Sequence, residues 1–212
     1  MMFQRDGVPL SIIMDGSKEQ TMGEFRKKAR AAGCRIKQTE PYSPWQNAAE
    51  SAIREVKRAA GRKMIESKCP RRLWDHFIEL EGMIRSSTAL DSYELNRQVP
   101  ETIVSGQTAD ISPFVEYSWY EWVKYYDKTA SFPSPQELLG RWLGPTVDLG
   151  PAMTAKILKA NGNIEYNSTH RALTESELQD PEEVALRETF TKSVNDKIGP
   201  PVDHEALEDI HV

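Results

Sequence analysis

The pattern of hydrophobic and polar positions predicts three elements in the N-terminal part of the chain. Leu10 to Met14 is a short apolar run rich in Ile, typical of a buried strand, and it ends at the turn pair Asp15-Gly16. Apolar positions recur at helical spacing between Glu19 and Ala32, and Gly33 is a residue that commonly ends a helix. Cys34 to Gln38 predicts a second strand. A strand, a helix and a strand in so short a stretch predict a right-handed parallel βαβ unit.

A longer helix is predicted from residue 45 to residue 66. Two start signals overlap there: Ser43-Pro44, and Asn47 followed three residues later by Glu50. Glu50 falls on one face with Arg54 and Lys57, at the positive end of the helix dipole. A different face is apolar and consists of Ala49, Ile53, Val56, Ala60 and Met64.

The pattern changes after this helix. Pro70 to Leu95 has the apolar spacing of another amphipathic helix, whereas Val99 to Phe114 is rich in loop residues. Tyr117 to Tyr126 is aromatic and β-prone, and two short apolar runs flank Asn161-Gly162, as in a hairpin. These features predict a small all-β module over residues 113–174.

Charge is distributed unevenly along the chain. Residues 24–72 contain fourteen Lys or Arg against five Asp or Glu, a net charge of +9. Residues 175–212 contain three against eleven, a net charge of −8. The basic stretch suits a polyanionic partner, whereas the acidic stretch, which includes Pro200-Pro201, predicts a mobile, disordered linker or tail over residues 175–212.

Composition places the chain in a broad class. Charged residues make up 28% and hydrophobic residues 39% of the 212 residues, which is typical of a soluble globular protein. No apolar run is long enough to span a membrane, and the N-terminus lacks the pattern of a signal peptide. Cys34 and Cys69 give no disulfide framework. We therefore expect an intracellular protein, cytoplasmic or nuclear, with no membrane partner.

Asp15 and Glu50 are the candidate chemical groups. The two strands of the βαβ unit run in the same direction, so Asp15 and the loop toward Glu50 leave the sheet at the same edge. Two converging carboxylates suit a hard metal ion beside a phosphate. A plainer interpretation stays open, in which Asp15 belongs to a turn and Glu50 caps a solvated, charged helix.

The stretch from Pro41 to Glu50 resembles a known family. Pro41-Tyr42-Ser43-Pro44, Gln46-Asn47 and Glu50, placed after a βαβ unit with an Asp at its first strand end, resemble the integrase core of LTR retrotransposons. The copia-type branch of the retroviral integrase superfamily looks closest, and the resemblance covers residues 10–174. It implies a ribonuclease H-like fold with three catalytic carboxylates. Asp15 matches the second Asp, Glu50 the Glu, and Glu19 the Glu of the D-N-G-x-E-F motif.

The chain departs from the family's pattern at several places. Between Asp15 and Glu50 there are 34 residues, one fewer than the family's usual spacing, and Ala48 stands in place of a loop Gly. No Asp matches the first of the triad. The N-terminal His/Cys zinc module also has no counterpart, since the histidines are scattered at His76, His170, His204 and His211. The resemblance therefore implies the C-terminal half of an integrase core over residues 1–112, an SH3-like β module over 113–174 and the acidic linker over 175–212.

The function that the resemblance implies is DNA integration by metal-dependent phosphoryl transfer. Asp15 and Glu50 would hold Mg²⁺ or Mn²⁺, and no zinc is expected. The residues that would contact DNA are Trp45, Gln46, Asn47, Arg54, Lys57, Arg58 and Arg62. We expect the chain alone to be inactive, because the first Asp is missing, and to bind DNA weakly and without sequence preference. It is also expected to belong to a larger polyprotein and to self-associate through an open sheet edge.

Two other classes of function stay open. The chain is then either a catalytically dead remnant that binds at most nucleic acid or another protein, or a plain α/β interaction protein in which the motif is accidental. Plainer interpretations of the candidate residues also stay open, in which the basic residues form only a solvated face and Trp45 simply packs.

Overall fold

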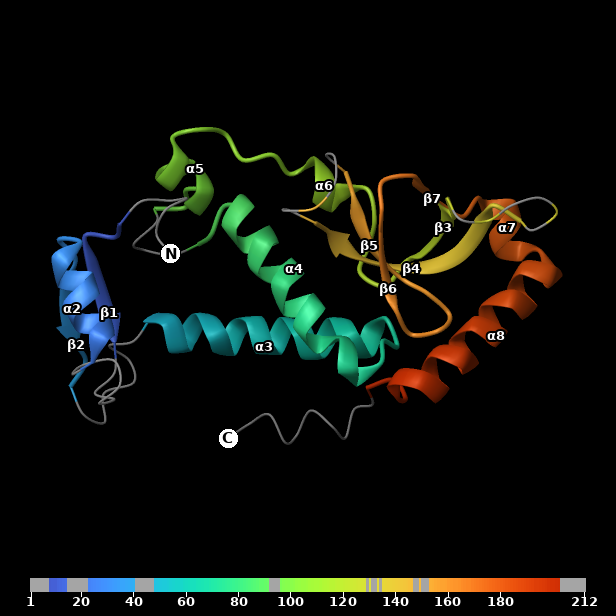
Figure 1. The fold of residues 1–212 in the computed structure, drawn as a ribbon, viewed down its shortest axis with the longest axis horizontal. Helices are drawn as coiled ribbons and strands as arrows, with labels where there is room; N and C mark the ends of the chain where they lie inside the picture. The colour runs from blue at the N-terminus through green and yellow to red at the C-terminus, as the bar shows by residue number, and fades with distance from the viewer. Residues whose placement is uncertain are drawn as a thin grey trace.

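The computed structural model describes residues 8–14, 23–40, 48–91, 96–128, 130, 133, 135–146, 149 and 153–202. Over these residues the protein is a mixed α/β structure with a two-stranded parallel sheet, a five-stranded antiparallel sheet and seven α-helices. Figure 1 shows the small sheet at one end of the long helix α3 and the larger sheet toward its other end.

The predicted parallel βαβ unit is confirmed. Strand β1 (Ser11–Met14) and strand β2 (Arg35–Gln38) pair in parallel, and helix α2 (Glu24–Ala31) connects them. The unit is thinly packed, because the described apolar side chains on its surface include Leu10, which is 89% exposed, and Ile13, which is 52% exposed. Two strands and one helix bury too little apolar surface to be stable by themselves.

Helix α3 (Ala48–Glu66) changes its environment halfway along. From residue 49 to residue 58 its side chains are exposed, apart from the half-buried Val56, whereas Ala60 and Met64 are buried. The burial comes from helix α4 (Trp74–Ser87), which crosses the second half of α3 (Figure 1). The first half of α3 therefore has no buried side chain, and it contacts α4 through Glu55 near its end.

The segment after α3 forms several short elements where its pattern predicted one helix and a loop-rich passage. The helix predicted over Pro70–Leu95 is a 3-10 turn, Arg71–Leu73, followed by α4, and residues 92–95 lie outside the described part. The passage predicted as loop-rich contains two short helices, α5 (Pro100–Ser105) and α6 (Ser112–Val115). Both begin near a proline, which has its φ angle already set for a helix start.

The β-rich part predicted from the aromatic run and the hairpin signal is present. Its five antiparallel strands lie in the order β6-β5-β4-β3-β7, and the hairpin predicted at Asn161-Gly162 joins β5 to β6. A register shift between Trp142 and Pro145 marks a bulge in the longest strand. The strands are β3 (Trp122–Tyr126), β4 (Glu137–Pro145), β5 (Ala155–Leu158), β6 (Ile164–Asn167) and β7 (His170–Ala172).

The prediction of a disordered tail is wrong for residues 175–198. Two helices occupy them, α7 (Glu175–Gln179) and α8 (Pro181–Ile198). Thr174 caps α7 with a capping box, and Asp180 caps α8, whose first residue is Pro181. Most acidic residues of the two helices are exposed, but Glu177 and Glu183 pair with Lys124 of β3. Phe190 and Val194 are buried in the core shared with the larger sheet. Residues 203–212 lie outside the described part.

One hydrophobic core joins α3, α4, the larger sheet and α8. Its buried members include Met64, Phe77, Trp119, Trp142, Ile157 and Phe190. The chain after α8 also returns to the turn between α3 and α4, where Val202 N donates to Cys69 O at 3.1 Å. The core thus extends across the boundary predicted between residues 112 and 113.

Candidate nucleic-acid interface

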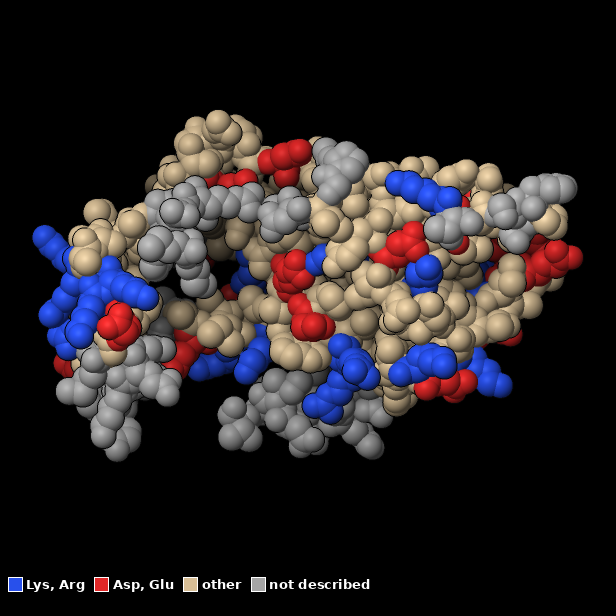
Figure 2. Space-filling view, in the orientation of Figure 1, with Lys and Arg blue, Asp and Glu red and all other residues tan. Residues whose placement is uncertain are grey.

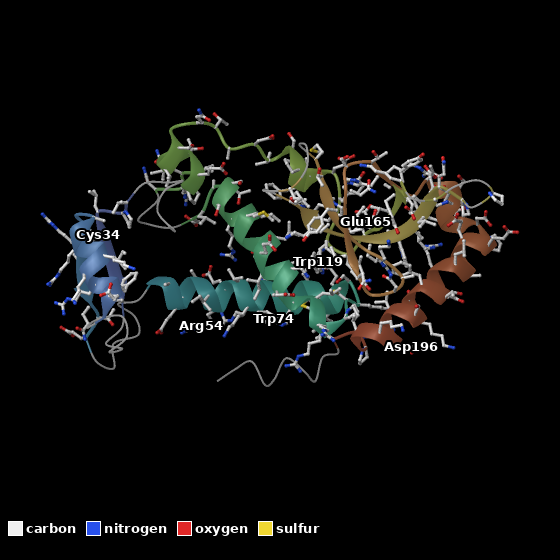
Figure 3. All side chains as sticks on the ribbon, in the orientation of Figure 1. Cys34, Arg54, Trp74, Trp119, Glu165 and Asp196 are labelled. Atoms are coloured by element: carbon white, nitrogen blue, oxygen red, sulfur yellow. The ribbon has the colours of Figure 1, made fainter. Side chains whose placement is uncertain are left out.

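The described candidates for DNA contact all lie on α3. Arg54, Lys57, Arg58 and Arg62 are exposed along this helix, and Glu50 is exposed in its first turn. Figure 3 labels Arg54 on the outer side of α3, away from the larger sheet. Asp15, Glu19, Trp45, Gln46 and Asn47, the other residues singled out from the sequence, lie outside the described residues.

The basic residues share one side of the helix. At about 100° per residue, Glu50, Arg54 and Lys57 fall within a sector of about 60°. Arg58 and Arg62 extend this sector to one side, so that the cations follow the length of the helix. Within the part of the chain that the structure describes, none of the four forms an ion pair. They are therefore available to bind an anion.

The βαβ unit adds positive charge that the candidate set did not include. Figure 2 shows blue Lys and Arg atoms gathered on this unit and along the outer side of α3. The exposed cations of the unit are Lys27, Lys28, Arg30, Arg35 and Lys37. Their signal was present in the net charge of residues 24–72, but charge alone does not show that they stay on the surface. The structure does show it, because the unit has almost no interior in which to bury them.

The described carboxylates do not form a metal site. Among the residues that the structure describes, no three His, Cys, Asp or Glu side chains lie close enough together to hold a metal ion. Glu50 is exposed on α3, and its predicted partner Asp15 is outside the described residues. The convergence of these two carboxylates therefore stays a prediction.

An ion pair fixes the boundary between the free and the packed halves of α3. Arg85 of α4 donates from Nη1 to Glu55 Oε2 at 3.1 Å and from Nε to Glu81 Oε1 at 2.7 Å. These hydrogen bonds raise the pKa of Arg85 above its ordinary value. Glu55 therefore pairs with α4 rather than with a cation of α3.

A cavity lies where α3 and α4 meet the larger sheet. It has a volume of about 400 Å³, and its walls combine aromatic, aliphatic and charged side chains, with Arg62 and Lys63 on the α3 side. The aromatic residues in its walls are Phe77, Phe114, Tyr117, Trp119 and Trp142. Nearby polar groups are poor nucleophiles, because burial raises the pKa of both Tyr117 and Cys69 to about 12.

Comparisons with known proteins give no family. No protein-family model matches the chain, and no curated protein matches it either. Among the described helices, none combines the length and the apolar composition needed to cross a membrane.

Proposed function

We propose that this chain is part of an integrase-type polynucleotidyl transferase, and that its own contribution is non-specific binding of DNA through helix α3. One observation carries the proposal. The first half of α3 is exposed apart from Val56, and it presents Arg54, Lys57 and Arg58 without carboxylate partners among the described residues. Cations arranged in this way bind the evenly spaced phosphates of a nucleic acid backbone without reading its bases.

The βαβ unit supports the finer proposal of a partial ribonuclease H-like core. A parallel strand pair leads into α3, in the order that the resemblance implies. Ile13 of β1, Phe25 of α2 and Ile53 of α3 are between 41% and 53% exposed. A complementing half of such a core, added beside β1, would cover apolar surface of this kind.

The larger sheet supports the proposal of an SH3-like module beside that core. It has five short antiparallel strands, and the bulge in β4 between Trp142 and Pro145 bends the sheet as small barrels require. The module and α8 share their core with α4, so α3 has a rigid base from which to present its cations.

In the completed core, Asp15 and Glu50 would hold Mg²⁺ or Mn²⁺, which would supply charge stabilisation at a phosphate. The described residues alone do not make up such a ligand set. The role proposed for this chain's own cations is to bind and orient the DNA strand. The chain alone is therefore proposed to be inactive in strand transfer.

DNA binding is tested by the fluorescence anisotropy of a labelled duplex at several salt concentrations. Reversing two charges with Arg54→Glu and Lys57→Glu should weaken binding about tenfold, and each lost phosphate contact should lower the salt slope by about 0.9. The matched control reverses two exposed cations outside α3 and outside any proposed site, Lys128→Glu and Lys197→Glu, at the same net charge. Equal losses in both variants, or binding that does not depend on salt, would refute the proposed role of α3.

A catalytically dead remnant is the second candidate. Glu50 favours it, because this carboxylate is exposed and belongs to no cluster of three possible metal ligands among the described residues. A strand-transfer assay with Mg²⁺ or Mn²⁺ separates the two when a complementing half of the core is added. Activity that appears on addition and disappears with Glu50→Gln supports the integrase proposal. If DNA binding persists and no activity appears with any complementing half, the remnant is the better description.

A further inference from the structure

Arg141 of β4 is a half-buried cation with an unusual set of contacts. Its Cζ lies 3.3 Å from the centroid of the Trp122 ring and 4.4 Å from that of Tyr120. Its Nη1 donates to Tyr120 O at 2.7 Å. Its Nε is shielded from solvent and has no hydrogen-bond acceptor among the described residues.

Arg141 also lacks a counter-ion. The other inward-lying cations of this sheet each have a carboxylate, since Lys124 pairs with Glu177 and Lys156 pairs with Glu79. No carboxylate oxygen of the described residues lies within ion-pair distance of Arg141. Burial lowers its pKa to about 10, so it remains a cation at neutral pH. An unpaired buried charge destabilises a fold, and a bound anion would offset that cost.

A groove opens beside Arg141, between the sheet and α8. Its volume is about 760 Å³, and Arg141 and Trp122 form the side that belongs to the sheet. Arg187 and Lys192 of α8 lie on the opposite side. Arg187 donates to two backbone carbonyls, Leu178 O at 2.6 Å and Glu183 O at 3.3 Å, and pairs with no carboxylate in the described part. Two guanidinium groups without counter-ions therefore share one groove.

We propose that this groove binds a compact oxyanion, a phosphate or carboxylate group, between Arg141, Arg187 and Lys192. Guanidinium groups match the oxygen spacing of both anions. A long polyanion fits less well, because Glu188 and Asp196 line the same groove; Figure 3 labels Asp196 on α8. Arg141 also covers one face of Trp122, and Phe190 packs edge-on with ring centroids 5.2 Å apart, so less of Trp122 is left for stacking with a base. The proposal does not depend on the function proposed for α3.

The probes are inorganic phosphate and acetate, titrated into the full chain by calorimetry at an ionic strength held constant with chloride. Saturable binding of at least one probe is expected. Arg187→Gln and Arg141→Gln should each weaken it about tenfold, the size expected for one charge-assisted interaction. Lys197→Gln, which removes an exposed cation of α8 outside the groove, should leave it unchanged. The two probes also distinguish a phosphate ligand from a carboxylate ligand.

Three outcomes would overturn the proposal. The first is no saturable heat with either anion, and the second is an equal loss in Lys197→Gln and Arg187→Gln. The third is binding of a single-stranded oligonucleotide through Arg141 and Arg187 without competition by phosphate, which would make the groove a polyanion site. If Arg141→Gln fails to fold, Arg187→Gln decides alone, because Arg187 is only half-buried.

Discussion

Lys124 Nζ lies 3.0 Å from Glu177 Oε1 and thereby ties strand β3 to the first turn of α7. The same carboxylate accepts two hydrogen bonds from Arg171 of β7, at 2.8 and 2.9 Å, and one from the backbone N–H of Thr174. One acidic side chain therefore joins two strands to the helical segment that its sequence had predicted to be a mobile linker.

Glu177→Gln should destabilise the protein at pH 7 by about 1–2 kcal/mol, because it removes the charge from these hydrogen bonds. The hydrogen bonds from Arg171, above all, hold the pKa of Glu177 well below its ordinary value of 4.5. A carboxyl with a lowered folded-state pKa contributes stability that is fully present above the unfolded-state pKa and is lost as the pH falls. The difference between wild type and variant should therefore shrink below about pH 4.5 in urea unfolding.

Glu188→Gln serves as the control for this pH dependence, because Glu188 is exposed and forms no ion pair with the described residues. It should change the free energy of unfolding little at either pH. An equal loss of stability for Glu177→Gln at pH 7 and pH 3 would show that the ionised carboxylate is not responsible.

Phe190→Ala should destabilise the protein by about 3–5 kcal/mol, because it empties a buried aromatic site. The ring is 4% exposed and contacts Trp122 edge-on. Leu186→Ala, on the same helix but 56% exposed, should cost no more than about 0.5 kcal/mol. If chemical denaturation shows no difference between the two variants, α8 does not belong to the core.

Gly140→Ala should destabilise the larger sheet, whereas Gly82→Ala should not. A Cβ at Gly140 would collide with Ile157 Cγ2 and approach Leu158 O to 3.1 Å, inside the core. Overpacking of this kind costs about 1–3 kcal/mol. A Cβ at Gly82 meets no atom within 4 Å and improves the helix propensity of α4, so a gain of about 0.5–1 kcal/mol is expected. Melting temperatures that move in the same direction would contradict the packing at Gly140.

The two cysteines should report separately on the two parts of the protein. Burial raises the pKa of Cys69 to about 12, and its side chain is 0% exposed, so a thiol reagent at pH 8 should label it only after global unfolding. Cys34 is buried in the thin βαβ unit and should be labelled much faster through local opening. Variants Cys34→Ala and Cys69→Ala assign the two rates.

Hydrogen exchange gives an independent check on the same difference. Backbone amides of Ile12, Ile13 and Ile36 should exchange faster in the dilute monomer than those of Val123 and Trp142. Slow exchange throughout β1 and β2 in a monomer would show that the unit is stable without a further partner.

Local patterns predicted the elements that depend on neighbouring residues. The apolar run before Asp15, the helical spacing after Gln46 and the Asn161-Gly162 turn each act over a few residues, and the strands and helices follow them. The resemblance to integrases rests on the same local stretch, and residues 41–47, which carry most of it, lie outside the described part. The structure therefore places candidate residues only along α3, and their role stays a prediction.

Tertiary contacts explain what the sequence did not reveal. High acidity suggested disorder after residue 174. However, Phe190, Val194 and Ile198 recur every four residues and pack into the core that α8 shares with the larger sheet. The sequence did not single out Arg141, because its proposed role in anion binding rests on the lack of a carboxylate partner among the described residues. Only the packed structure shows that its guanidinium group lies against the rings of Trp122 and Tyr120, with no carboxylate of the described residues within ion-pair distance.

Because the first half of α3 has no buried side chain, residues can be inserted there without disturbing the packing at either end of the helix. One alanine inserted between Ser51 and Ala52 would lie among exposed side chains and would touch no packed one. It would turn the βαβ unit about the helix axis by about 100° relative to the sheet. Three or four inserted residues would bring the unit back to nearly the same side, about 5–6 Å farther out. A partner that contacts the βαβ unit and the larger sheet at once should therefore still bind after an insertion of one helical turn. It should lose affinity after an insertion of half a turn.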